Sequence, residues 1–212
     1  MPLPPWLDRL LCQPRCPRCQ RPAPRRALCI SCRRNLGLEA DGLRGQCPLP
    51  WWALGSYADG WRSQLLQLRR QPNPWLVEAL ASQLLQQLPD LGVPLLVTAI
   101  PSRRPGGNPL PLQLAQVLSR LGGHQLLPAL GRQRACLGQH HLNKAQRQAN
   151  LQGVFICTRP AGPRLQPLLL VDDILTSGAT AVAAMAALEA GGHGLLGMAC
   201  FARTPAKRRQ SD

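Results

Sequence analysis

The sequence has little lysine and few acidic residues. Lysine occurs only at Lys144 and Lys207, so 23 of the 25 basic residues are arginine, and ten acidic residues leave a net charge of +15. This charge favours anionic partners, namely phosphorylated metabolites or nucleic acid. Arginine suits phosphate because its planar guanidinium donates several hydrogen bonds. A GC-rich genome would also raise the share of arginine, without any such role.

The sequence also lacks a long uninterrupted apolar run. The best candidate, residues 181–201, is broken by Glu189, by Gly191–Gly192 and by His193, and predicts a helix, a turn and a strand. The first residues, MPLPPWLDRLLC, have no continuous apolar core of the kind a secretory signal needs. We therefore expect a cytoplasmic protein without a membrane span, which partners could bring to the inner face of the membrane.

Cysteine is concentrated at the start of the chain, where residues 1–50 hold six of the nine. In the reducing cytosol, clustered cysteines favour metal binding over disulfides. Two C-x-x-C pairs stand nine residues apart, and together they offer the four sulfurs of a tetrahedral zinc site. We predict a zinc-ribbon module over residues 1–50, with a structural Zn²⁺ bound by Cys16, Cys19, Cys29 and Cys32.

Beyond residue 51, segments of helical spacing alternate with extended apolar runs. Helices are expected near residues 56–70, 74–88, 111–121 and 179–190, and strands at 93–100, 153–157, 167–171 and 194–201. The polar, basic residues 131–150 are expected to form a long loop or flap. Strand–helix–strand units imply a parallel α/β sheet. We predict an α/β domain over residues 51–205 and a polar tail over 206–212.

The string LLLVDDILTSGAT, residues 168–180, joins a predicted strand to a predicted helix. Ligands of parallel sheets bind beyond the carboxyl ends of the strands. Backbone N–H groups at the helix start, with the hydroxyls of Thr176, Ser177 and Thr180, would form an anion site. Gly178 would let the backbone approach the ligand closely. The loop therefore predicts a bound phosphate.

Two carboxylates stand directly before this loop. Asp172 and Asp173 cannot face the same phosphate without repulsion, so we expect them to contact sugar hydroxyls or a divalent cation attached to it. A phosphate and a ribose diol together describe a ribose 5-phosphate. The sequence has no G-x-x-x-x-G-K-[ST] loop, which argues against a P-loop nucleotide hydrolase.

This string resembles the phosphoribosyl pyrophosphate (PRPP) motif of type I phosphoribosyltransferases. The wider chain is similar to the ComF family of competence proteins, which join an N-terminal zinc ribbon to such a domain. The similarity includes both cysteine pairs, YADGWRSQLLQLRR, the region of Pro101 and Asn108, and GQHHLNKAQRQANLQGVF. It implies a type I phosphoribosyltransferase-like parallel sheet with flanking helices, and PRPP bound together with Mg²⁺.

The resemblance also implies roles for individual residues. Asp172 and Asp173 would be the catalytic residues and hold the ribose hydroxyls. The 5-phosphate would lie on Thr176, Ser177, Gly178, Ala179 and Thr180. Family members often carry Arg-Gly-Phe-Asn where this chain reads RRPGGNP, and Arg103 and Arg104 are the candidates for the pyrophosphate side there. Gln139, Arg147 and Asn150 match the family's flexible loop.

The resemblance implies a role in DNA uptake, through the handling of single-stranded DNA with the uptake machinery. Candidate nucleic-acid contacts are Arg132, Arg134, Lys144 and Arg147, in a segment that has no acidic residue. Thr176 stands where base-salvage enzymes commonly carry Asp. The alternatives are an active PRPP-dependent transferase of nucleotide metabolism and a PRPP sensor.

Four tryptophans, Trp51, Trp52, Trp61 and Trp75, lie near the predicted domain junction. We expect them to pack the module against the core, and base stacking is the alternative. The sequence indicates neither the acceptor substrate nor the oligomeric state.

Overall fold

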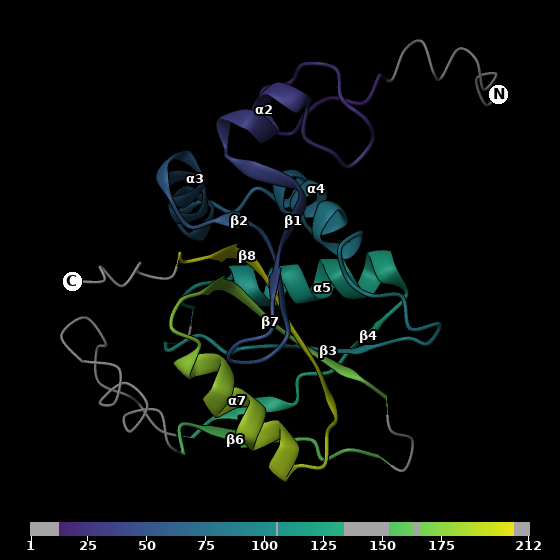
Figure 1. Ribbon diagram of the computed structural model, residues 1–212, viewed down its shortest axis with the longest axis vertical. Coiled ribbons are helices and arrows are strands. Elements are labelled where there is room, and N and C mark those ends of the chain that lie inside the picture. Colours follow the sequence, from purple (N-terminus) through teal and green to yellow (C-terminus); the bar gives the residue numbers. More distant parts are fainter. Residues whose placement is uncertain (1–12, 105, 134–152, 163–165, 206–212) are drawn as a thin grey trace, which may run out of the picture.

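The computed structural model describes residues 13–104, 106–133, 153–162 and 166–205. A six-stranded sheet with helices on both faces carries a small N-terminal module at one end (Figure 1). The sheet order is β1-β2-β8-β7-β3-β4. The strands are β1 Leu38–Gly45, β2 Trp51–Ser56, β3 Leu96–Ala99, β4 Gln125–Leu126, β7 Leu168–Leu175 and β8 Leu195–Arg203.

The five strands β2, β8, β7, β3 and β4 lie side by side in this order, and each pairs in parallel with its neighbours. β1 runs antiparallel to β2. The predicted α/β class with a mostly parallel sheet is therefore confirmed. A separate antiparallel pair is formed by β5 (Leu130–Arg132) and β6 (Phe155–Cys157).

Each face of the sheet has its own apolar core. Leu169 and Val171 of β7 belong to one core, which contains residues of α3 (Asp59–Arg70), α4 (Pro74–Leu85) and α5 (Leu110–Gly122). Leu168 and Leu170 belong to the other, with α7 (Ala179–Ala190), β5 and β6. Successive side chains of a strand point to opposite faces, so the continuous apolar run of β7 fits a strand buried on both sides. Among the described helices, none is long and apolar enough to span a membrane.

The structure corrects two strand predictions. β7 continues to Leu175, past the expected end at residue 171, because β8 runs beside it and supplies backbone partners as far as Arg203. β1 and β2 were not expected at all. β1 lies before residue 50 and pairs with β2, so chain on both sides of the predicted domain boundary contributes to one sheet. The division at residue 50 itself stays a prediction.

The tryptophans have different environments. Trp61 is 1% exposed, donates its indole N–H to the Phe201 carbonyl at 3.1 Å and meets the Phe201 ring edge to face at 6.3 Å. This fits the predicted packing role. Trp75 is 74% exposed, so it does not serve the expected role of packing the module against the core.

Candidate functional site

Four cysteine side chains meet in the N-terminal module, which comprises residues 13–37 and includes α2 (Ile30–Asn35). All four Sγ atoms lie within 4.8 Å of one another, and those of Cys19 and Cys29 are 3.5 Å apart. Zinc–sulfur bonds of about 2.3 Å in a tetrahedron separate the sulfurs by about 3.8 Å. The predicted convergence of Cys16, Cys19, Cys29 and Cys32 is confirmed, and the cluster could hold a metal ion such as zinc.

Two arginines donate hydrogen bonds to these sulfurs. Arg21 Nε lies 3.4 Å from Cys19 Sγ and lowers the pKa of Cys19 to about 6. Arg18 Nη1 lies 3.7 Å from Cys32 Sγ, but burial outweighs it and raises the pKa of Cys32 to about 12. A metal ion would supply the positive charge that a buried thiolate needs. Arg18 Nε also donates to Gln64 Oε1 at 3.1 Å, which ties the module to α3.

A pocket of about 620 Å³ opens at the carboxyl ends of β3 and β7, the edge where parallel sheets bind ligands. Six of the residues singled out in the sequence for ribose phosphate binding line it. These are Arg103, Arg104, Asp172, Asp173, Thr176 and Thr180. Arg103 and Arg104 thus share one cavity with residues that lie at least 68 positions further along the chain.

The two aspartates are held differently. Asp173 is 3% exposed, and its Oδ2 accepts hydrogen bonds from Arg69 Nε and from Asn108 Nδ2, both at 2.6 Å. The Asp172 side chain points to the opposite face of the strand, and its Oδ1 accepts a hydrogen bond from the backbone N–H of Asp173 at 2.8 Å. Asp173 therefore organises the pocket walls, and Asp172 is the carboxylate better placed to meet a ligand.

The ionisation of Asp172 is costly in the absence of a ligand. Burial first, and then the negative charge of Asp173, raise the pKa of Asp172 well above its usual value. Burial alone would lower the pKa of Arg69, but its hydrogen bond and ion pair with Asp173 outweigh this and raise it. A cation or a set of hydroxyl donors beside Asp172 would relieve the cost of its charge.

The hydroxyl loop leads directly from β7 into α7. Gly178 has φ +81°, and a Cβ atom there would lie 2.3 Å from Pro48 Cγ, so both conformation and space require glycine. Arg203 braces the loop from β8, because its Nη1 donates to the carbonyls of Leu175 and Thr176. The first N–H group of α7, that of Ala179, donates to Ser177 Oγ at 3.5 Å. The next ones lack intrahelical acceptors, as at any helix start, so they can bind an anion.

The pocket carries more positive than negative charge. Besides the two aspartates, its wall contains four arginines: Arg69, Arg103, Arg104 and Arg132. Arg69 is used by Asp173, whereas Arg103 and Arg104 are exposed. A ligand that carries several phosphate charges would balance this excess.

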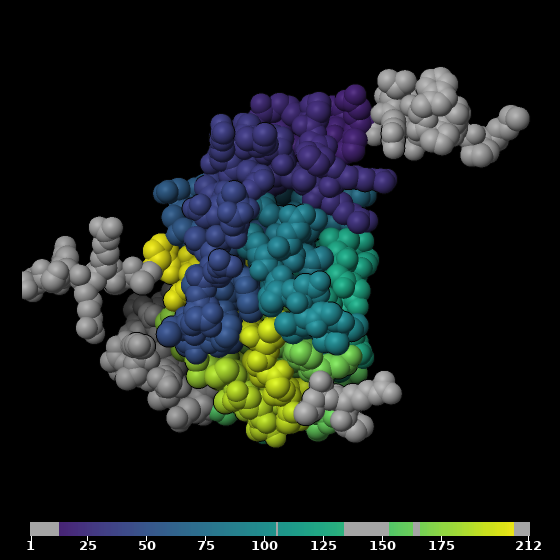
Figure 2. All heavy atoms as spheres, turned by 45° about the vertical axis from the view of Figure 1, so that its right-hand side comes forward, coloured from purple at the N-terminus to yellow at the C-terminus, as the bar shows by residue number. Residues whose placement is uncertain are grey.

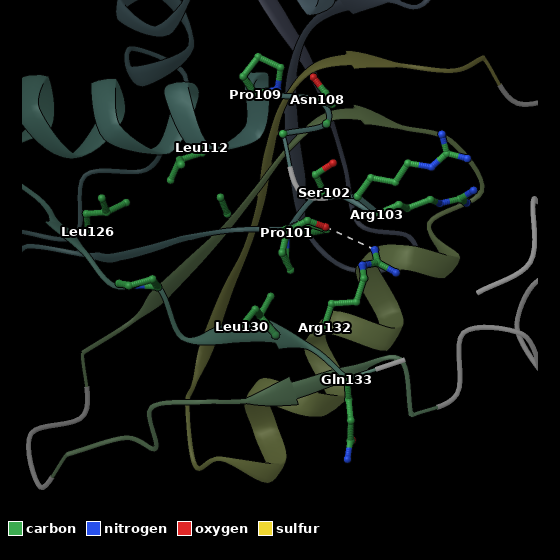
Figure 3. A pocket seen from close by; sticks show the side chains of 16 residues that line it. Pro101, Ser102, Arg103, Asn108, Pro109, Leu112, Leu126, Leu130, Arg132 and Gln133 are labelled. Carbon is green, nitrogen blue, oxygen red and sulfur yellow. Dashed lines mark hydrogen bonds between the residues drawn. The ribbon is translucent and has the colours of Figure 1, made fainter. Parts of the chain in front are cut away.

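A second cavity of about 730 Å³ adjoins the first and shares the wall of residues 100–104. Figure 3 shows Leu112 and Leu126 on one side of it, and on the other side Arg103 and Arg132, whose guanidinium points toward Pro101. Arg132 Nη2 donates to the Pro101 carbonyl at 3.4 Å, and its guanidinium lies 4.7 Å from the centre of the Phe155 ring. The two cavities together offer an apolar and a charged compartment side by side.

The other predicted site residues lie in the pocket walls, in the turn into α7 or outside the described residues. Arg132, a candidate nucleic-acid contact, lies in the wall shared by both cavities. Ser177, Gly178 and Ala179 form the turn into α7 but are not among the residues that line the pocket. The candidates Arg134, Gln139, Lys144, Arg147 and Asn150 lie outside the described residues.

Two arginines were missed as site residues, Arg69 in the pocket wall and Arg203 beside the hydroxyl loop. Arg69 is 104 positions from Asp173 in the sequence, and Arg203 is the last residue of β8. Each is one arginine among 23, and no local pattern marks either. Asn108 belonged to a segment of family resemblance, but its bond to Asp173 was not foreseen.

The comparisons with known proteins give no further guide, because no family model matches the chain and no curated protein matches it either.

Proposed function

We propose that the pocket binds a ribose 5-phosphate, above all PRPP, and that the protein is a ComF-like member of the type I phosphoribosyltransferase family. The observation that carries the proposal is the arrangement around one 620 Å³ pocket. An acidic pair, a hydroxyl loop that starts a helix, and a surplus of arginine meet at the carboxyl edge of parallel strands. Each part matches one group of PRPP.

In this proposal the 5-phosphate lies on the loop of residues 176–180, where helix N–H groups and hydroxyls favour an anion. Asp172 accepts hydrogen bonds from the ribose hydroxyls. Asp173 acts indirectly, because it positions Arg69 and Asn108. Arg103 and Arg104 stand on the pyrophosphate side.

Mg²⁺ would arrive with PRPP. Carboxylate and phosphate oxygens are the ligands that Mg²⁺ prefers, and the raised pKa of Asp172 indicates a carboxylate that gains from a nearby cation. The ion would offset charge between this carboxylate and the pyrophosphate.

The family resemblance and the net charge of +15 support a role in DNA uptake through single-stranded DNA. An active transferase is the second candidate. In that reaction an acceptor displaces pyrophosphate from the anomeric carbon of PRPP, and positioning and charge stabilisation carry most of the catalysis. The adjoining 730 Å³ cavity favours this candidate, since it leaves room for an acceptor.

Titration calorimetry with PRPP and Mg²⁺ tests the proposal. Asp172→Asn should weaken binding by about ten- to a hundredfold, because a hydrogen bond to a charged group is worth about 1.5–3 kcal/mol. Asp41→Asn is the matched control, because Asp41 is exposed on β1 and outside this pocket. Equal affinities in wild type and Asp172→Asn, or no binding to wild type, would reject the proposal.

A further inference from the structure

A groove of about 510 Å³ lies between the N-terminal module and the helices α4 and α5. Figure 2 shows the purple module stacked directly above the teal surface of the helices beneath it. No described residue lines both this groove and the ribose phosphate pocket. The side chains that matter here are Arg15, Arg25, Arg26, Trp75, Glu78 and Arg120.

The indole of Trp75 is the aromatic surface of this groove. Its residue is 74% exposed in the first turn of α4. The cation–π and ring contacts among the described residues all lie elsewhere, at Tyr57, Trp51, Phe155 and Trp61. Within the described part of the chain, no ring or guanidinium covers the Trp75 ring, so its faces can stack on a planar ligand.

The groove is strongly basic. Four arginines stand against one carboxylate, which leaves a surplus of three positive charges. Glu78 is 15% exposed and accepts from Arg26 Nε at 2.7 Å and from Arg120 Nη2 at 3.3 Å. Neither Arg15 nor Arg25 pairs with a carboxylate of the described residues.

The Glu78 bridge also gives the groove a defined shape. Arg26 belongs to the module, Glu78 to α4 and Arg120 to α5, so one carboxylate joins the three parts that form the walls. Both arginines keep more than half of their side-chain surface exposed, 54% and 55%. They can therefore hold the walls together and still present N–H groups to an anion.

Arg15 Nη1 donates to the Gln20 carbonyl at 3.0 Å, which leaves its other N–H groups for a ligand. An open aromatic ring next to guanidinium groups that have no carboxylate partner among the described residues matches a ligand that joins a planar ring to an anion. We propose that the groove binds a nucleotide, whose base stacks on Trp75 and whose phosphate lies between Arg15 and Arg25. A free nucleotide and a nucleotide within a single strand share this chemistry. For a nucleotide within a single strand, the inference rests on the proposed role in handling DNA. For a free nucleotide it does not.

Fluorescence anisotropy with a labelled oligodeoxyadenylate of about ten nucleotides measures the strand, and calorimetry with AMP measures the free nucleotide. Trp75→Leu should weaken binding about five- to a hundredfold, because base stacking carries that much affinity. Trp75→Phe keeps an aromatic ring and should recover most of it. Arg25→Gln should reduce the slope of log K against log salt for the strand by about 0.7.

Arg44→Gln is the matched control, because it removes the same charge from exposed β1, outside the groove. It should leave both affinities close to wild type. If Trp75→Leu weakens the binding of AMP, the ligand is a free nucleotide. If Trp75→Leu weakens the binding of the oligonucleotide alone, the ligand is a strand.

If Trp75→Leu and Arg25→Gln both keep wild-type affinity, the proposal that the groove binds a nucleotide is wrong, even if the protein binds DNA elsewhere. Failure of the wild-type protein to bind either probe would overturn it as well. PRPP binding measured on the same sample then shows separately whether the ribose phosphate pocket stands.

Discussion

The buried ion pair between Arg69 and Asp173 should hold the pocket together. Breaking a fully buried pair costs about 3–5 kcal/mol. The Asp173 side chain is 4% exposed but that of Arg69 is 32% exposed, so water reaches one partner and the cost falls to about 2–3 kcal/mol. We expect Arg69→Gln and Asp173→Asn each to lower the free energy of unfolding by that amount, and Tm by about 4–12 °C.

Urea denaturation of wild type, both single variants and the double variant measures the coupling. The double variant replaces the two charges by two neutral amides that can still form a hydrogen bond. It should therefore be more stable than the two single losses together predict, by about 1–2 kcal/mol. Single losses below about 0.5 kcal/mol that add without coupling would refute the reasoning, since surface substitutions behave in that way.

Three other predictions concern single positions. Because the folded protein raises the pKa of Asp172 above 3.8, the unfolded chain releases this proton first, and stability falls as pH rises from about 4 towards the raised pKa. Asp172→Asn should therefore be more stable than wild type at pH 7 but not below about pH 4, and a destabilised variant in neutral urea denaturation would contradict this. Gly178→Ala should lower stability by about 1–2 kcal/mol for its positive φ and by more for the contact with Pro48. Gly192→Ala has φ +83° but its Cβ meets only Ala161 at 3.5 Å, so thermal denaturation showing equal losses would refute the role of Pro48. Cys19→Ser should release zinc and loosen the N-terminal module while the α/β sheet stays folded, and elemental analysis that finds no zinc in wild type purified without chelator would contradict the metal site.

The features predicted from the sequence are those written in a local pattern. The glycine and hydroxyl residues of 176–180, followed by an alanine-rich segment, predicted a helix over 179–190, and α7 spans these residues. Two C-x-x-C pairs predicted the four-cysteine cluster. In both cases neighbours in the sequence determine the geometry.

The features that were missed depend on partners far away in the sequence. The sequence around Asp173 does not predict its contact with Arg69, because only the fold brings α3 and β7 together. The length of β7 depends on β8, which lies beside it. Trp75 could have been placed better, because Val77, Leu80 and Leu84 form one buried stripe of α4 and position 75 lies on the opposite side of a helix with 3.6 residues per turn.

A crystal structure of the protein grown with PRPP and Mg²⁺ tests the central claim most directly. We expect the 5-phosphate on residues 176–180, ribose hydroxyls within hydrogen-bond distance of Asp172, and pyrophosphate beside Arg103 and Arg104. Ligand bound at another place, or a pocket that stays empty at a PRPP concentration far above that of the protein, would contradict it.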